Sequence, residues 1–270
     1  MSALRVALAQ FGAGLGEPDA NAARMLGFLG RACAEGADLV CFPELCVSGY
    51  LLDAAAYDDH LMAGVARAEA SLAEAAAAAR VAVVYGAPRR TPGGLANLVV
   101  HVAADGTATR YQKTHMDVLE RQVFAPGAAF VTTPDRTFGL ACCYDLAFPE
   151  PARVLAVQGA RVLLVPMAWE VRRSFVLEKV AGARAVENVA YLVCVNQCGR
   201  VGPFAFHGAS RVVDPLGDAV VTLANEETLV VVELDLGLVD RLRDRTDGRT
   251  YPLLDDRRPG LYSAPAGEAP

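Results

Sequence analysis

Two segments far apart in the chain repeat one pattern, and this pattern constrains the fold more than any other feature. Gly36 to Pro43 reads GADLVCFP, and Gly159 to Pro166 reads GARVLLVP. In each segment a glycine ends a helix, a continuous apolar run typical of a buried strand follows, and a proline closes the run. Two similar halves would pack as one unit. Helices that alternate with strands therefore predict an α/β fold with a two-sheet core and helices outside.

The remaining elements follow from hydrophobic spacing. Apolar residues at helical spacing predict helices near 19–35, 61–79, 150–158, 171–187 and 239–243. Short apolar runs predict strands near 5–9, 38–42, 81–87, 97–102, 107–111, 161–165, 190–195, 210–213, 219–223 and 229–234. No linker divides the chain. We therefore expect a single domain over residues 1–262, with a polar tail from about residue 245 that has no core pattern.

Composition and charge narrow the class of partner. The 270 residues are 53% hydrophobic, which is ample for a large core, and 31 acids against 25 bases give a net charge of −6. No long run of either sign occurs, so nucleic acid and anionic membranes are not expected as partners, whereas small molecules are. The N-terminus does not resemble a signal peptide, no segment is long and apolar enough to cross a bilayer, and seven cysteines do not suggest a disulfide framework. We expect a cytoplasmic protein with reduced thiols.

The stretch FGLACCYDLAFPE, from Phe138 to Glu150, has the features of a reactive centre. An apolar strand runs out at two cysteines, a polar turn interrupts it, and Pro149 and Glu150 open a helix. Such a turn lifts a side chain out of the sheet, and the backbone N–H groups after it point at an oxygen that a nucleophile would create. Successive strand side chains point to opposite faces, so only one cysteine can face a given pocket. Cys143 lies nearer the turn and is our candidate, although buried cysteines commonly pack as small hydrophobes.

Two further candidates lie just beyond predicted strands. Glu44 follows the first repeated segment directly, and Lys113 follows the strand near 107–111. Taken alone, each has an ordinary explanation, because glutamates often lie in solvated loops and lysines often mark the edges of sheets. However, the C-terminal ends of strands are where α/β folds gather their chemistry. We therefore expect Glu44, Lys113 and Cys143 to converge.

At these residues the chain resembles the nitrilase superfamily of carbon–nitrogen hydrolases, in particular its amidase-like branch. The resemblance rests on Phe-Pro-Glu at 42–44, Lys-Thr-His at 113–115, and the spacing of Gly, Cys-Tyr-Asp and Phe-Pro-Glu from 139 to 150. Further likeness occurs in LERQVFAPG around Glu120, in HGASRVVDPLG from His207, and in DRRPGLY near the C-terminus. The resemblance covers nearly the whole chain. Tyrosine after the cysteine favours the amidase branch, since nitrilases commonly have tryptophan there.

The resemblance implies roles for four residues. Cys143 would be the nucleophile, Glu44 the general base, Lys113 the partner of the oxyanion, and Glu120 the residue that orients the lysine and the substrate. It also implies an α-β-β-α four-layer sandwich that needs no cofactor or metal and forms a homodimer or higher homo-oligomer, with the tail packing on the partner subunit. The physical requirements agree, since an amide is a poor electrophile and needs a thiolate, a stabilised oxyanion and a proton for the departing ammonia.

The substrate is less constrained than the reaction. By likeness to relatives, the loop with Trp169 and Glu170 lines the acyl pocket, and Tyr144 and Tyr50 are our other candidates for binding the substrate. An aromatic wall with an acid behind it would suit a small aliphatic amide that carries an amino group, and it predicts that a short ω-amino amide outcompetes its ω-carboxy analogue. N-carbamoyl compounds and nitriles remain alternatives, because their hydrolysis uses related chemistry.

Three other hypotheses stay open at this point. A Cys–His mechanism would use His115 or His207 as the base, whereas a structural histidine is the simpler interpretation of each. A metal or redox protein would use Cys142, Cys143, Cys194 and Cys198, although this spacing is not a usual zinc pattern. A binding protein without catalysis could have the same fold, but the presence of all three candidate catalytic residues argues against it.

Overall fold

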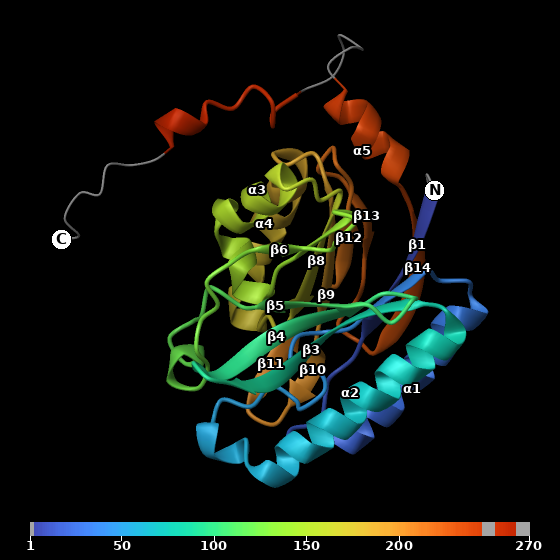
Figure 1. The fold of residues 1–270 in the computed structure, drawn as a ribbon, viewed down its shortest axis with the longest axis vertical. Coiled ribbons are helices and arrows are strands. Elements are labelled where there is room, and N and C mark those ends of the chain that lie inside the picture. The colour runs from blue at the N-terminus through green and yellow to red at the C-terminus, as the bar shows by residue number, and fades with distance from the viewer. Residues whose placement is uncertain (1–2, 245–251, 263–270) are drawn as a thin grey trace, which may run out of the picture.

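The protein has two six-stranded sheets that pack against each other, with helices on both outer faces (Figure 1). The computed structural model describes residues 3–244 and 252–262. Hydrophobic residues from both sheets form a shared core, for example Val6 and Leu8 from one sheet with Leu164 and Val193 from the other. Ala7 and Ala9 alternate with them and face the helices on the opposite side. The predicted α-β-β-α sandwich is confirmed.

The two sheets have the same plan. The first is ordered β14 (Thr228–Asp235), β1 (Ala3–Gln10), β2 (Leu39–Cys41), β3 (Ala82–Thr91), β4 (Gly94–Val102) and β5 (Ala108–Gln112). The second is ordered β6 (Val131–Thr132), β7 (Phe138–Leu140), β8 (Val162–Met167), β9 (Tyr191–Asn196), β12 (Arg211–Val213) and β13 (Ala219–Thr222). In each sheet three parallel strands are flanked by antiparallel ones. The repeated segments form β2 and β8, the middle parallel strands.

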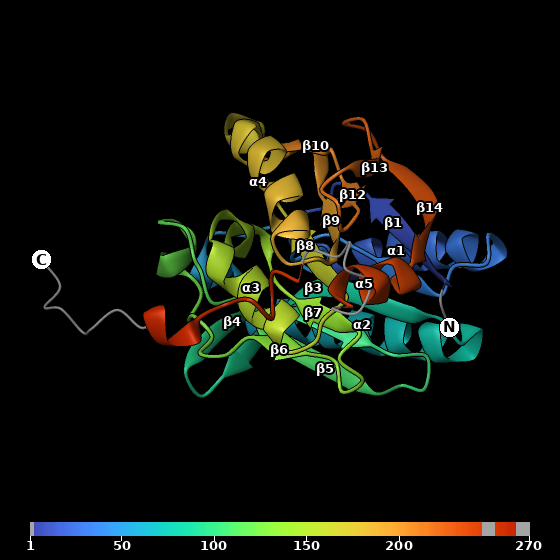
Figure 2. The ribbon, with the colours of Figure 1, turned by 90° about the horizontal axis from the view of Figure 1, so that it is seen from above.

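Helices from each half cover the sheet of that half (Figure 2). The first sheet is covered by α1 (Pro18–Ala34) and α2 (Asp59–Ala79), and the second by α3 (Pro149–Val157) and α4 (Ser174–Val186). A further helix, α5 (Leu236–Arg243), follows β14, and short 3-10 turns are η1 (Ala54–Ala56), η2 (Glu120–Gln122), η3 (Cys143–Ala147), η4 (Val171–Arg173) and η6 (Pro259–Leu261). Two of these turns, η2 and η3, carry candidate site residues.

The helices and most strands lie where the hydrophobic pattern predicts them. Four features differ. The hairpin of β10 (Cys198–Val201) and β11 (Phe204–His207) was not predicted, since glycine and arginine break its apolar pattern. The two residues of β6 are too short to show a period, and β3 continues through Pro88 to Thr91. Residues 171–173, expected as helix, form a 3-10 turn before α4.

The polar tail predicted from about residue 245 lies partly outside the described residues, which do not include 245–251 or 263–270. Residues Pro252 to Asp255 line a pocket with Ala156 and Val157 of α3, and Arg257 and Tyr262 line another with Arg153. The described part of the tail therefore lies against its own α3. Packing of the tail on a partner subunit, and a single domain over 1–262, stay predictions.

Candidate active site

The candidate residues lie where strands of both sheets end. Glu44 follows β2, Lys113 follows β5, Cys143 follows β7, and Trp169 follows β8. The backbone N–H of Glu44 donates to the carbonyl oxygen of Met167 at 3.3 Å, which joins the ends of the two repeated strands. The structure therefore brings Glu44, Lys113 and Cys143 close together, as predicted.

Cys143 has an unusual backbone at the first position of η3. Its φ of 44° lies in the left-handed region, which non-glycine residues rarely adopt. Such strain persists only where the surrounding structure holds it, and it is common at functional sites. Cys143 lines a pocket, while Cys142, the residue before it, is fully buried in the core. The pocket cysteine is thus the one expected from the strand-to-turn position.

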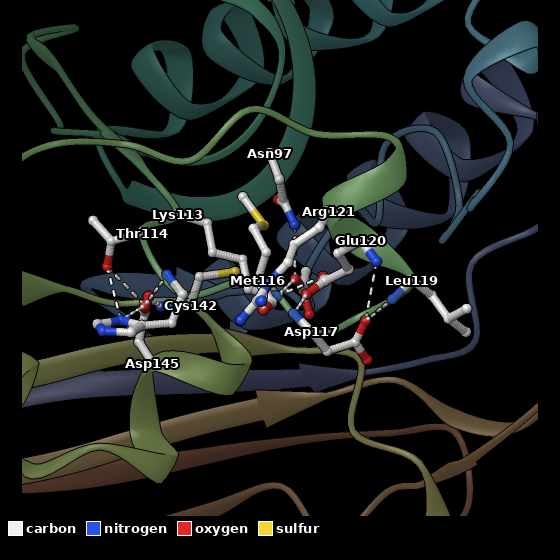
Figure 3. Close-up of polar contacts among 12 residues, drawn as sticks. Asn97, Lys113, Thr114, Met116, Asp117, Leu119, Glu120, Arg121, Cys142 and Asp145 are labelled. Carbon is white, nitrogen blue, oxygen red and sulfur yellow. Dashed lines mark hydrogen bonds and ion pairs between the residues drawn. The ribbon is translucent and has the colours of Figure 1, made fainter. Parts of the chain in front are cut away.

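Lys113 belongs to a buried cluster of four polar residues. The Lys113 Nζ donates to Glu44 Oε1 at 2.7 Å and to Glu120 Oε1 at 2.6 Å, and Asn97 Nδ2 donates to the same Glu44 oxygen at 2.7 Å. Figure 3 shows Asn97, Lys113 and Glu120 directed toward one another. We call Glu44, Asn97, Lys113 and Glu120 the lysine cluster. Two of the three Lys113 N–H groups are engaged within the described part of the chain, which leaves one for a ligand.

The electrostatics of the lysine cluster keep Lys113 charged. Burial by itself would lower the pKa of Lys113, but the carboxylates of Glu120 and Glu44 outweigh it, so the pKa lies well above its ordinary value. For Glu120, burial raises the pKa more than Lys113 lowers it. Burial and the negative charge of Glu44 also raise the pKa of the Cys143 thiol, against the opposing effect of Lys113. The thiol is therefore protonated at rest, and attack by its sulfur needs a base.

One oxygen of Glu44 is left free by the hydrogen bonds of the lysine cluster. Glu44 Oε2 is buried and has no hydrogen-bond partner among residues 3–244 and 252–262. An unpaired buried carboxylate oxygen is costly, so its retention points to use by a substrate, a proton or water. Close packing holds the backbone of this residue. A side chain at Gly86 would lie 2.1 Å from the Leu45 nitrogen and 2.7 Å from the Glu44 Cα, so only glycine fits there.

A capping box holds Glu120. The backbone N–H groups of Leu119 and Glu120 donate to Asp117 Oδ1 at 2.8 and 3.0 Å, and the Asp117 N–H donates back to Glu120 Oε2 at 3.0 Å (Figure 3). On its other oxygen, Asp117 accepts a bond of 3.2 Å from Arg173 of η4. Glu120 is thereby fixed through both oxygens, one toward Lys113 and one toward its own turn.

A third buried carboxylate lies beside Cys143. Asp145 Oδ1 accepts hydrogen bonds from the Thr114 hydroxyl and from the backbone and ring nitrogens of His115, and Oδ2 accepts from the Tyr111 hydroxyl and the Cys142 N–H, all at 2.7–3.0 Å. We call these five residues the aspartate cluster. Burial opposes ionisation of Asp145, but the bonds from His115 and Tyr111 outweigh it and its pKa is lowered. The cluster ties the loop after Lys113 to the turn that carries Cys143.

The pocket brings together every residue expected to bind the substrate. Its lining contains Tyr50, Tyr144, Trp169 and Glu170 with Cys143, Glu120, Asp117, Ala168 and Arg173. The cavity measures about 20 Å³, close to the space that one water needs. The reacting end of a substrate must therefore be small. The Trp169 Nε1 donates to the Arg173 carbonyl at 2.7 Å, and Glu170 accepts a bond from Arg172, so this wall is held by hydrogen bonds.

The histidines proposed for Cys–His chemistry have other partners. The His115 Nδ1 lies 2.8 Å from Asp145 Oδ1, and its ring stacks on Phe148 with centroids 4.3 Å apart. The His207 Nε2 lies 3.9 Å from Glu178 Oε1. Within the described residues, no group of three or more His, Cys, Asp or Glu side chains is arranged to hold a metal ion, and no helix is long and apolar enough to cross a membrane.

Sequence reasoning missed Asn97, Asp117, Asp145 and Arg173 as parts of the site. One signal was available for Asn97, because an amide at the start of the apolar strand 97–102 is unusual unless it is bonded. Asp117 and Glu120 have capping-box spacing, which could have been recognised. Nothing in the sequence distinguishes Arg173 from its neighbour Arg172.

Comparison with known proteins gives consistent results. The carbon-nitrogen hydrolase family model matches residues 5–244. An (R)-stereoselective amidase from Pseudomonas sp. is 34% identical over 94% of this chain and 92% of its own length, and a nitrilase from Pyrococcus abyssi is 30% identical over 96% and 99%. The crystal structure of an amidase from Nesterenkonia sp. superposes with a TM-score of 0.83 at 30% identity, covering 96% of this chain and 94% of that one.

The sandwich of two similar sheets and the family match place the chain among hydrolases that act on carbon–nitrogen bonds. The chain belongs to the carbon-nitrogen hydrolase family, within the nitrilase superfamily. The resemblance read from the sequence is confirmed.

Proposed function

We propose that this protein hydrolyses a small aliphatic amide to a carboxylic acid and ammonia through an acyl-enzyme on Cys143. The observation that carries the proposal is the unpaired Oε2 of Glu44 in a buried cluster with Lys113, beside a thiol that is protonated at rest. Relatives support the choice of an amide. One solved structure shows a mutant of the Nesterenkonia amidase with the acetamide moiety of fluoroacetamide added covalently at its active site cysteine.

The first half of the reaction forms the acyl-enzyme. Glu44 Oε2 accepts the Cys143 thiol proton as the sulfur attacks the carbonyl carbon. The carbonyl oxygen becomes an oxyanion, and the free N–H of Lys113 and the backbone N–H of Tyr144 donate to it. The C–N bond then breaks as Glu44 returns the proton to nitrogen, and ammonia leaves.

The second half releases the acid. Glu44 removes a proton from water, the water oxygen attacks the thioester carbon, and Lys113 again stabilises the oxyanion. The C–S bond breaks, the sulfur takes the proton back from Glu44, and the carboxylic acid departs. Glu120 holds Lys113 in place throughout. One water is consumed per amide, so atoms and charges balance.

The pocket wall supports a short acyl group. Tyr50, Tyr144 and Trp169 supply aromatic surface, and Glu170 supplies one negative charge that Arg172 offsets. The preference for an ω-amino over an ω-carboxy amide therefore stays a prediction, and competition between the two amides tests it.

The deciding experiment measures ammonia release from aliphatic amides, nitriles and N-carbamoyl amines, with wild type and Cys143→Ala in parallel. Amide turnover that disappears in the variant supports both the reaction and the nucleophile. A panel in which nitriles or N-carbamoyl amines are the better substrates would replace the amide with that class. Amide turnover that survives in Cys143→Ala would contradict the proposed nucleophile.

A further inference from the structure

The pocket at Cys143 lies beside a larger groove on the surface. The groove has a volume of about 530 Å³ and is lined by Met116, Asp117, Val118, Arg121, Tyr144, Ala147, Trp169, Arg173, Phe175 and Val176. Four of these residues also line the inner pocket of about 20 Å³, namely Asp117, Tyr144, Trp169 and Arg173. The two spaces therefore meet at a shared boundary.

The boundary is a collar held by hydrogen bonds. Arg173 Nη1 donates to Asp117 Oδ2 at 3.2 Å, and Trp169 Nε1 donates to the Arg173 carbonyl at 2.7 Å. The ion pair joins η4 to the turn that carries Glu120, so it forms part of the wall between the pocket and the groove. The charges of Asp117 and Arg173 offset each other, and the collar does not demand a charged ligand.

The outer groove has large exposed apolar side chains in its lining. The Val118 side chain is 68% exposed and that of Phe175 is 63% exposed, and both line the groove with Met116, Ala147 and Val176. These two residues come from different segments, one beside η2 and one in α4. Exposed apolar residues that gather from separate segments commonly mark a binding surface.

We infer that this groove is a subsite for the distal part of the acyl group, and that it takes an apolar aliphatic or aryl extension. The inference rests on the proposed amide hydrolysis, because it places the amide in the inner pocket and the rest of the substrate beyond the collar. Adjacency through four shared wall residues selects the substrate as the occupant. The inner cavity is narrow, so an acyl chain longer than the reacting group has to extend past the collar.

The test uses straight-chain amides from acetamide to octanamide, together with 3-phenylpropionamide. In wild type, kcat/KM rises roughly two- to fourfold for each methylene that reaches the groove. In Phe175→Ser and in Val118→Ser, the ratio of kcat/KM for octanamide to that for acetamide falls roughly tenfold. Leu216→Ser is the matched control, because Leu216 is 55% exposed in a turn that does not line the groove, and this variant keeps the wild-type profile.

Binding gives a readout that does not depend on turnover. In Cys143→Ala, calorimetric titration shows octanamide bound more tightly than acetamide, and addition of Phe175→Ser removes that difference. Equal affinity for short and long amides would overturn the subsite, as would a chain-length profile unchanged in Phe175→Ser.

The subsite and the proposed function fail in different ways. Cys143-dependent turnover of acetamide with a flat chain-length profile contradicts the subsite alone. Absence of turnover for every amide contradicts the proposed function, while the titration still reports on the groove. If Phe175→Ser changed the sedimentation behaviour and left the profile intact, the groove would be a contact between copies of the chain, which also overturns the subsite.

Discussion

Glu44 and Asp145 are both fully buried carboxylates next to the nucleophile, yet their hydrogen bonding differs. Asp145 accepts five hydrogen bonds shared over both oxygens. Glu44 accepts two bonds on Oε1, while its Oε2 has no partner among the described residues. A carboxylate whose two oxygens both accept hydrogen bonds stabilises a fixed geometry, since it has little capacity left to take up a proton. A carboxylate with one free oxygen retains a position where a proton can be taken up and released.

The comparison separates two tasks that the same chemical group performs. The aspartate cluster fixes the backbone at Cys142 and at the loop after Lys113, so it positions the reacting groups. The lysine cluster places charge and a free acceptor where a substrate would react. Four substitutions test this division, in order of decreasing expected effect.

Replacement of Lys113, the cation of the lysine cluster, should have the largest combined effect on stability and turnover. In Lys113→Met, the carboxylates of Glu44 and Glu120 lose the charge that compensates them in a buried site, which typically costs about 3–5 kcal/mol of unfolding free energy. The loss of an oxyanion donor should also lower kcat by roughly 10²–10³-fold. Denaturant unfolding and amide turnover measure the two effects. Lys179→Met, at an unrelated position in α4, is the control, and equal stability of the two variants would contradict the proposed role of Lys113.

Substitution of the base should affect catalysis more than stability. In Glu44→Gln, kcat should fall roughly 10²–10⁴-fold, because the amide cannot accept the thiol proton. Lys113 keeps its pair with Glu120, so the unfolding free energy should fall less than in Lys113→Met. Single-turnover kinetics with purified protein measure the acylation step. A variant that retained most of its turnover would show that Glu44 is not the base.

Substitution of Asp145, whose two oxygens both accept hydrogen bonds, should affect stability more than catalysis. In Asp145→Asn, an amide N–H₂ replaces an acceptor among five donors and should cost about 1–3 kcal/mol of unfolding free energy. Turnover should fall by less than the roughly hundredfold that misplacement by about 1 Å can cause. A larger loss of turnover than in Glu44→Gln would assign Asp145 a direct part in the chemistry.

The same variant should show a distinct response to acid. The folded-state pKa of Asp145 is lowered, so its contribution to stability is present above the unfolded-state pKa of about 3.9 and is lost as pH falls through the folded-state value. Glu120, with a raised pKa, contributes in the opposite sense, and its stabilising effect is lost as pH rises through its folded-state value. Unfolding measured between pH 3 and pH 7 should show a shallower acid dependence in Asp145→Asn than in wild type. An unchanged slope would mean that folding does not lower the pKa of Asp145.

Replacement of the neighbouring histidine should have the smallest effect. In His115→Ala, one of the five bonds to Asp145 disappears, so we expect stability to fall by about 1 kcal/mol and kcat by less than tenfold. The ring bonds to Asp145 and stacks on Phe148, which gives it a structural part. His207→Ala provides the matched comparison. Loss of acylation in either folded variant would favour Cys–His chemistry over the Glu44 mechanism.

Local sequence was sufficient to identify candidate site residues at 42–44, 113–115 and 142–150, because motifs and strand ends are local properties. The repeated segments at 36–43 and 159–166 also predicted the two-sheet plan correctly. The hairpin of β10 and β11 was missed, since its glycine and arginine interrupt the apolar pattern on which strand prediction depends.

The sequence by itself determined the family and the α-β-β-α sandwich, and it supplied Glu44, Lys113 and Cys143 as candidates for the chemistry, because each depends on short motifs or hydrophobic periods. Only the tertiary structure decided how these residues are used. Asn97 and Lys113 reach Glu44 across 53 and 69 residues of chain, and Tyr111 reaches Asp145 across 34. Pairing of strands and packing of sheets bring such groups together, so whether a carboxylate oxygen ends saturated or free is a property of the assembled fold.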